Sequence, residues 1–319
     1  MLARIGQIRL DTIMYSHSPE RAAASLHLSE LVYEAAHAQV DGETRDRQTL
    51  RLGITTLGYL LRFGESPSDA GDVVHSLLVS QLGQAGVHPS LSVYDAWPSY
   101  QDIVARLPHV PIIRMGGDLS DFSNGYADVR RGTMIADGSL ETDASHVFHL
   151  MSLALPYAAE HYPTLDQGTL AAYMLLHDAP ERVVGDTRTL TISPEALAKK
   201  YQDEKLAMEA LSIELADYPE LFQLIRQYEA QQDPESRFVR TWDKYDVVFT
   251  HFLNNGLSLY TVHSIRSVQD FRDAFEAVTR RISSYGRDFP LVMEDRLTLL
   301  TEIAHIVPWT SLPNATIKT

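Results

Sequence analysis

The residues of this chain best suited to metal chemistry are His177 and Asp178, which follow the apolar run LAAYMLL (170–176). A carboxylate buried without a partner is costly, so an aspartate at this point needs a counter-charge, and a metal ion is the natural one. Residues that complete such a site lie upstream and downstream, His146 in ETDASHVFHL and Asp243 in FVRTWDKYD. The sequence therefore predicts a single metal site.

The spacing of these residues suits ligands that come from several helices. Neighbouring residues on a helix point about 100° apart, and two such side chains can still converge on one ion beside the helix. We expect His146 from the preceding helix and Asp243 from a later one. Two imidazoles and two carboxylates suit one divalent transition metal ion, Mn, Co, Fe, Ni or Zn, among which the sequence does not choose. The chain has no cysteine, which excludes a thiolate zinc site.

Two further carboxylates are candidates for catalysis. Glu181 is four residues after His177 and three after Asp178, offsets that share one face of a helix. A carboxylate beside a metal but outside its ligand set can act as a general acid or base towards water. Asp186 follows Gly185, where the helix should end, and from there it can orient the water or the glutamate.

The remaining histidines carry no comparable signal. His149, His161, His251 and His263 have no carboxylate at ligand spacing, so we interpret them as hydrogen-bonded residues of the core.

Three sequence blocks carry a family resemblance. They are RGTMIADGSLETDASH (131–146), LLHDAPERVVGDT (175–187) and QYEAQQDPESRFVRTWDKYD (227–246). In content, order and separation they resemble the 5′-deoxynucleotidase branch of the HD superfamily of metal-dependent phosphohydrolases. That branch includes the bacterial YfbR-type enzymes and the eukaryotic HD domain-containing protein 2 group.

The resemblance implies an all-α helical bundle around one divalent ion, and hydrolysis of nucleoside 5′-monophosphates to nucleoside and phosphate. It implies that Glu181 is the catalytic glutamate, Asp186 its supporting aspartate, and Arg131 an arginine near the substrate phosphate. The ligands that it implies are His146, His177, Asp178 and Asp243. Two alternatives stay open: a dNTP triphosphohydrolase, and a nucleotide-binding or assembly module with vestigial activity.

The chain departs from the family at two positions. Gly132 stands where the family often has an aromatic residue that helps select the 2′-deoxy sugar, so we expect weaker sugar discrimination here. Pro180 replaces a small or apolar residue. Proline removes a helical hydrogen bond and can kink the chain between Asp178 and Glu181.

Composition limits the partners and the compartment. With 42 acidic and 27 basic residues, the net charge of −15 repels a polyanion, so we expect a small-molecule nucleotide and no nucleic-acid polymer. The N-terminus does not resemble a signal peptide, and no apolar run approaches the roughly 20 residues of a membrane span. We therefore expect a cytoplasmic protein without a membrane partner.

Periodicity predicts helices throughout, in two domains. Residues 1–115 form an N-terminal helical domain, and residues 116–319 the HD phosphohydrolase domain. The first region faintly resembles MazG-type pyrophosphohydrolases, but GITTLG (53–58) replaces their second acidic pair. We therefore expect a structural or oligomerisation role, and a homo-oligomer among the partners. The expected helices are 19–40, 45–64, one from about 68, 100–107, one from about 142, 168–184, 193–215, 217–230, 234–255, 265–285 and 290–305, with a loop and short hairpin in 108–140.

Overall fold

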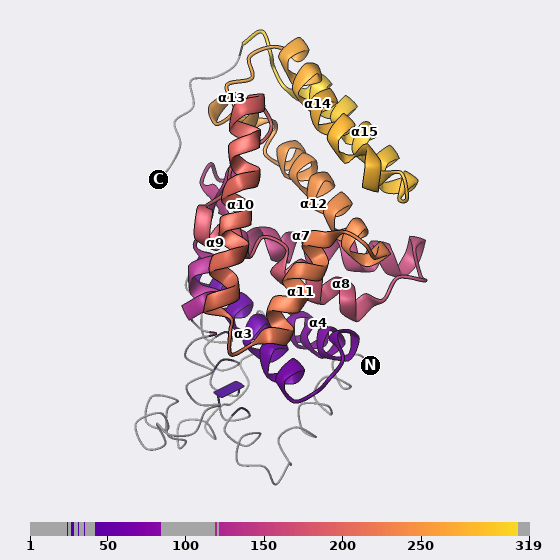
Figure 1. Cartoon of the computed structure of the whole chain (residues 1–319). Coiled ribbons are helices and arrows are strands. Elements are labelled where there is room, and N and C mark those ends of the chain that lie inside the picture. The colour runs from indigo at the N-terminus through magenta and orange to yellow at the C-terminus, as the bar shows by residue number, and fades with distance from the viewer. Residues whose placement is uncertain are drawn as a thin grey trace.

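The computed structural model describes residues 42–83, 119 and 121–311, together with positions 24, 27, 28, 31 and 35. This part of the chain is helical apart from one small hairpin, which confirms the predicted all-α class (Figure 1). The hairpin consists of β1 (Arg130–Met134) and β2 (Leu140–Thr142), which pair antiparallel. The helices are α3 (Gly42–Arg62), α4 (Pro67–Gly83), α7 (Asp143–His161), α8 (Gln167–Leu176), α9 (Glu181–Val184), α10 (Pro194–Glu214), α11 (Pro219–Ala230), α12 (Pro234–Leu253), α13 (Leu257–Thr261), α14 (Val268–Gly286) and α15 (Pro290–Ile306).

Local sequence explains where the helices near the site begin. The Thr142 side chain accepts a hydrogen bond from the backbone N–H of Ser145 and so starts α7. The side chain of Asp166 caps α8 and that of Asp233 caps α12 in the same way. Such caps satisfy backbone donors that the first turn leaves free. Proline at the first positions of α10, α11, α12 and α15 fits where no N–H is needed.

Helix α8 lies at the centre of the main core, and α4 packs directly against it. A β-carbon built on Gly71 would lie 1.8 Å from the backbone oxygen of Gly168, so two glycines let these helices touch backbone to backbone. The apolar run before His177 is fully enclosed in this way. The described N-terminal helices thus share one core with α7, α8, α11 and α12. The boundary predicted at residue 115 lies outside the described residues and stays a prediction.

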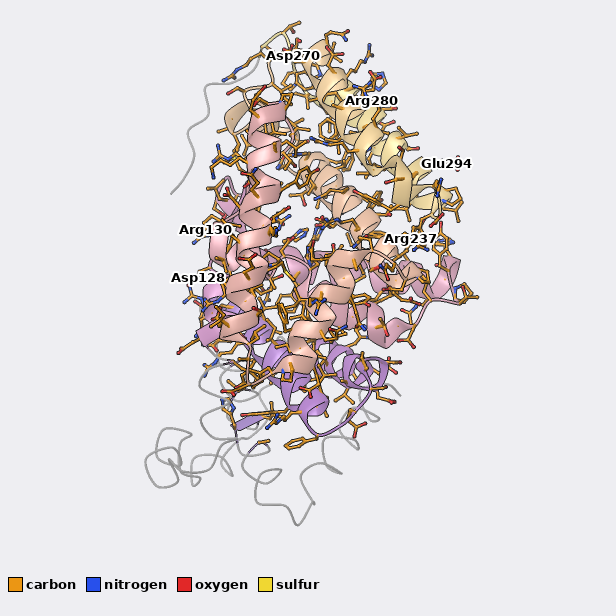
Figure 2. The ribbon with its side chains drawn as sticks, viewed as in Figure 1. Asp128, Arg130, Arg237, Asp270, Arg280 and Glu294 are labelled. Carbon is orange, nitrogen blue, oxygen red and sulfur yellow. The ribbon has the colours of Figure 1, made fainter. Side chains whose placement is uncertain are left out.

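A second apolar cluster joins α12 to the C-terminal helices. It includes Val248, Phe271, Phe275 and Ile303, from α12, α14 and α15. Helices α14 and α15 lie side by side at the end of the molecule opposite α3 and α4 (Figure 1). Exposed charged residues of these two helices, including Asp270, Arg280 and Glu294, lie at the edge of the molecule (Figure 2). In the described part, no helix is both long and apolar enough to cross a membrane.

Most predicted helices are present, with three differences. The helix expected over 168–184 ends at Leu176, and turns over residues 177–180 separate it from α9. Pro180 explains the break, because it cannot donate the helical hydrogen bond. Gly185, with φ of 73°, ends α9 at the expected residue.

The short α13 was not predicted, and residues 121–127 are helical inside the expected loop. The expected helix 100–107 lies outside the described residues.

Candidate metal centre

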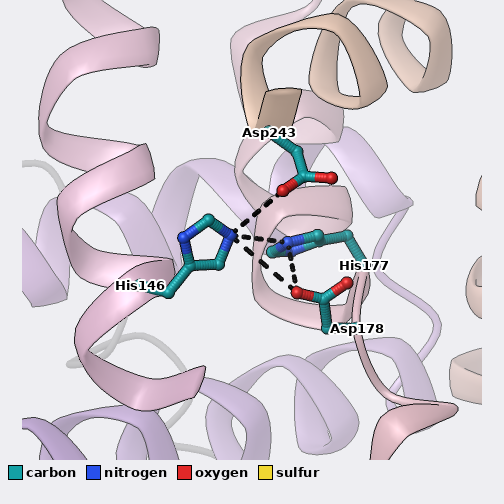
Figure 3. Close-up of side chains that lie close together, drawn as sticks. All are labelled: His146, His177, Asp178 and Asp243. Atoms are coloured by element: carbon teal, nitrogen blue, oxygen red, sulfur yellow. Dashed lines mark hydrogen bonds and ion pairs between the residues drawn. The ribbon is translucent and has the colours of Figure 1, made fainter. Parts of the chain in front are cut away.

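Four side chains from three parts of the chain meet at one buried point (Figure 3). His146 lies in the first turn of α7, His177 and Asp178 lie in the turn after α8, and Asp243 lies in the middle of α12. His146 Nε2 is 3.2 Å from His177 Nε2 and 3.3 Å from Asp243 Oδ1, and His177 Nε2 is 2.9 Å from Asp178 Oδ2. Two donor atoms about 3 Å apart can both lie roughly 2.0–2.2 Å from one ion when the ligand–metal–ligand angle is close to a right angle.

The other ring nitrogens fix how both imidazoles face this point. His177 Nδ1 lies 2.8 Å from the carbonyl oxygen of Met174, and His146 Nδ1 lies 3.0 Å from Asp246 Oδ2. Both oxygens are acceptors, so they favour a proton on Nδ1 and leave the Nε2 lone pair free to bind a metal. Asp243 Oδ1 is buried and makes no hydrogen bond within the described part of the chain. A cation at this point would satisfy it.

Asp246 was not predicted as part of the site, although it is three residues after Asp243 on the same helix face. Its carboxylate is buried between two histidines, with Oδ1 2.7 Å from His149 Nδ1. Burial and the nearby Arg131 charge work against a charged His146, but Asp243 and Asp246 outweigh them and raise the pKa of His146 to about 10. A metal ion that binds Nε2 would therefore displace a proton. This contact with Asp246 agrees with the interpretation that His149 has a polar partner and is not a metal ligand.

The Arg131 guanidinium lies beside the four side chains and is itself buried. Its Nη1 contacts Asp178 and lies 2.9 Å from Asp143 Oδ1, while its Nη2 lies 3.7 Å from Asp243 Oδ1. Burial alone would raise the pKa of Asp178, but His177 and Arg131 outweigh it and hold that pKa well below its ordinary value. The arginine thus faces the same point as the candidate ligands, where it can reach an anion bound there.

Lys244 is a second cation at the site, and sequence reasoning missed it. Its Nζ lies 2.7 Å from Asp243 Oδ2, on the carboxylate oxygen that does not face His146. The signal that was available is its position directly after a candidate ligand. Two cations therefore offset part of the negative charge of the carboxylates around the site.

Glu181 reaches the site by a route that differs from the predicted one. We expected it to share a continuous helix with His177, but it is the first residue of α9, after the turn that Pro180 helps to form. The turn nevertheless brings carboxylate oxygens of Asp143, Asp178 and Glu181 within 4.8 Å of one another. Its Oε2 is buried without a hydrogen bond to any described residue. Burial and the nearby Asp178 charge raise the pKa of Glu181 well above its ordinary value.

Asp186 holds the strand that carries Arg131. Its Oδ2 accepts a hydrogen bond from the backbone N–H of Gly132 at 2.7 Å. A β-carbon built on Gly132 would lie only 2.8 Å from Arg188 Cγ and 3.5 Å from Asp186 Oδ2. Glycine at this position therefore permits the close approach of the segment that follows α9 to β1.

Two cavities adjoin the four-residue site and share a wall that includes Asp178, Glu181, Lys200 and Lys244. The first also contains Arg131, Gly132 and Asp186, and it extends among residues of α12, α14 and α15. The second is lined by residues of α10, α11, α12 and α14. The candidate catalytic glutamate thus lines both cavities.

Comparison with known proteins shows which family this chain is similar to. The HD domain family model matches residues 127–279. The chain is 28% identical over 110 residues to 5′-deoxynucleotidase HDDC2 of Bos taurus, a match that covers 34% of this chain and 51% of that protein. The chain thus spans about half the length of this curated relative. A crystal structure of a predicted metal-dependent phosphohydrolase from Magnetospirillum magnetotacticum MS-1 is similar with a TM-score of 0.45 and 22% identity, over 60% of this chain and 95% of that one. The resemblance to the HD superfamily that was predicted from the sequence is confirmed, since residues 127–279 match the HD domain family model.

Proposed function

We propose that the protein is a metal-dependent phosphohydrolase that removes phosphate from (deoxy)nucleoside 5′-monophosphates. The observation that carries the proposal is the convergence of donor atoms from His146, His177, Asp178 and Asp243 at a buried point beside Glu181 and Arg131. The HD domain supports the reaction class, and the name of the bovine relative, a 5′-deoxynucleotidase, supports the substrate class.

The donor set fits one divalent ion. Two imidazole nitrogens and two carboxylate oxygens suit Mn, Co, Fe, Ni or Zn. Asp243 Oδ1, which makes no hydrogen bond to any described residue, would gain a ligand bond to such an ion. A divalent ion supplies a Lewis acid and lowers the pKa of water, which allows attack on phosphorus at neutral pH.

The protein's own residues then handle the proton and the phosphate. In this proposal Glu181 exchanges a proton with the attacking water, because its carboxyl group has a buried oxygen that makes no hydrogen bond to any described residue. Arg131 binds phosphate oxygens from its position beside Asp178. Asp186 holds β1 beside the site by accepting a hydrogen bond from the backbone N–H of Gly132. Lys244, paired with Asp243, limits the negative charge that a phosphate would meet.

Other predictions accompany this function. An acidic protein whose site cavity contains Arg131, Lys200 and Lys244 suits a small nucleotide better than a nucleic-acid polymer. The N-terminal helices share the core around α8, which supports a structural role for them. Self-association of the chain and a cytoplasmic location stay predictions.

A phosphate-release screen tests the proposal. Metal-stripped protein would be reloaded with Mn, Co, Fe, Ni, Zn or Mg and given ribo- and deoxynucleoside mono- and triphosphates, with Asp178→Asn as the inactive control. We expect inorganic phosphate from monophosphates and none from the metal-stripped protein. Faster release of triphosphate from dNTPs would favour the triphosphohydrolase alternative. Nucleotide binding without turnover under every ion would favour the vestigial module.

A further inference from the structure

A second group of carboxylates lies next to the candidate metal centre. One carboxylate oxygen each from Asp143, Asp178 and Glu181 lies within 4.8 Å of the others, and Asp178 belongs to both groups. Asp143 is completely buried, and its Oδ2 makes no hydrogen bond to any described residue. The same is true of the buried Oε2 of Glu181. Two buried oxygens of this group therefore have no hydrogen-bond donor in the described part of the chain.

Three carboxylates at this spacing can ligate a divalent ion. Carboxylate oxygens suit Mg and Mn in particular. In hydrolases that use two metal ions, the ions lie roughly 3.5–4 Å apart and act together on the phosphate. Asp178 is in the position of a ligand that two such ions would share. The question is therefore what balances the charge of this second group.

The Arg131 guanidinium already lies in this second group. Its Nη1 donates to Asp143 Oδ1 at 2.9 Å and also contacts Asp178 Oδ2. The same Asp178 oxygen lies 2.9 Å from His177 Nε2 in the four-residue centre. Asp178 Oδ2 is thus shared by the candidate metal ligands and the arginine. A guanidinium does not lose its proton in a protein, so the positive charge beside this oxygen is permanent.

The charges of the two groups fit one divalent ion better than two. Together the groups contain four carboxylates, those of Asp143, Asp178, Glu181 and Asp243. Arg131, Lys244 and one divalent ion would supply four positive charges, and both side chains contact carboxylates of these groups. A second ion beside Arg131 would place two further positive charges next to a buried guanidinium, where repulsion is poorly screened.

We infer that Arg131 takes the place of a second metal ion, because Asp143 and Asp178 hold its guanidinium where a two-metal phosphohydrolase would hold that ion. This inference rests on the proposed phosphohydrolase function. Nη1 is bound to carboxylates, and Nε is buried. Nη2 lies 3.7 Å from Asp243 Oδ1 and makes no hydrogen bond to a described residue. Arg131 also lines the first cavity, so Nη2 is the nitrogen that remains for a phosphate oxygen.

Asp143 thereby becomes a positioning residue of the site. It is the first residue of α7, three residues before His146, so one helical turn carries both the partner of Arg131 and a candidate metal ligand. Arg131 itself comes from β1. The contact of Asp143 with Arg131 therefore fixes the distance between the hairpin arginine and the ligand on α7.

Counting metal ions tests the inference without any nucleotide. Each protein would be loaded with excess Mn, freed of weakly bound ions and measured by elemental analysis. Electron paramagnetic resonance would detect two ions joined by one carboxylate as a spin-coupled pair. We expect one ion per chain in the native protein and a coupled pair in Arg131→Ala, because its buried carboxylates lose their counter-charge.

Two further variants control this count. Arg131→Ala combined with Asp143→Asn should return to one ion, because the second group then has two carboxylates instead of three. Arg130→Ala removes the neighbouring, exposed arginine of the same strand and should keep one ion. Melting curves establish that each variant is folded. Arg131→Gln, which is neutral but still polar, carries the test if Arg131→Ala does not fold.

Binding of inorganic phosphate tests whether a second ion can do what Arg131 does. Phosphate would be titrated calorimetrically into native protein and into Arg131→Ala loaded with one or two equivalents of Mn. With one equivalent, we expect the affinity of Arg131→Ala to be at least about tenfold below that of native protein, because hydrogen bonds to a charged group are strong. With two equivalents, we expect the affinity to recover.

The outcomes separate this inference from the proposed function. A coupled pair in the native protein, a single ion in the folded Arg131 variant, or phosphate affinity that does not recover would each overturn the inference. The expected ion counts and phosphate affinities without phosphate release from any nucleotide would support the inference and contradict the phosphohydrolase proposal. Phosphate release by native protein together with a single ion in Arg131→Ala would do the reverse.

Discussion

His146 Nδ1 lies 3.0 Å from Asp246 Oδ2, and both side chains are completely buried. Asp246 is one turn beyond Asp243 on α12, so the same helix face presents one carboxylate to the metal side of His146 and another to its opposite side. This arrangement orients the imidazole and makes its Nε2 a better metal ligand.

Asp246→Asn should therefore weaken metal binding although all four candidate ligands remain. Loss of a group that orients a metal-binding histidine typically reduces metal affinity about 10–100-fold. Competition with a chelating dye would measure the affinity. Asp203→Asn is a matched control, because Asp203 pairs only with Lys199 on the surface of α10 in the described part of the chain. Unchanged affinity in Asp246→Asn would show that the contact is only structural.

Glu181→Gln should abolish most turnover and leave the metal in place. Glutamine keeps the shape of the side chain but cannot exchange a proton, and general acid–base groups typically contribute about 10²–10⁴ in rate. Phosphate release gives the rate, and elemental analysis gives the metal content per chain. A variant that loses its metal would instead identify Glu181 as a ligand.

The sequence predicted the parts of this site that follow from residue type and helix position. His177 and Asp178 directly follow a buried apolar helix, and His146 and Asp243 lie on the buried faces of α7 and α12. These helices pack around α8, which brings the four side chains together. Helix starts were also predictable, because Thr142 and Asp233 carry recognisable capping patterns.

Pro180 predicted a kink between Asp178 and Glu181, but the sequence did not show that the helix ends before His177 and that a turn brings Glu181 to the site. Features that depend on tertiary packing were not predictable. Arg296 is distant in the sequence from every ligand, and only the packing of α15 on α12 brings it to Lys244. Asp246 was within reach of sequence reasoning, since its spacing from Asp243 matches that of His149 from His146.

His251 should make the protein sensitive to acid. Burial is the main cause that lowers its pKa from 6.5 to about 3 in the folded state. The unfolded chain therefore binds a proton first as the pH falls, so stability is full above about pH 6.5 and declines from there towards pH 3. Thermal melting of metal-free protein at pH 7 and pH 5 would measure the loss. His251→Gln should lose less stability over this interval, and equal losses in both proteins would contradict the assignment.

We predict that Gly132 and its neighbour Arg188 decide how well the protein discriminates between ribose and deoxyribose. Glycine offers no aromatic edge to crowd a 2′-hydroxyl group, so we expect kcat/KM for AMP and dAMP to differ by less than about tenfold, which corresponds to about 1.4 kcal/mol. We also expect both monophosphates to be preferred over ATP and dATP, because a triphosphate brings more negative charge to an acidic protein.

Arg188 is the candidate for a side chain that replaces the missing aromatic ring. Arg188 Cγ lies 2.8 Å from where a Gly132 β-carbon would be, so the arginine stem borders the space that a larger residue at position 132 would need. If native protein strongly prefers dAMP, the glycine argument is wrong, and Arg188→Ala tests whether the arginine stem crowds the ribose. Loss of the deoxy preference in Arg188→Ala, with dAMP turnover retained, would assign sugar selection to Arg188. Arg130→Ala is a suitable control, because that exposed arginine lies on the same hairpin and does not line either cavity at the site.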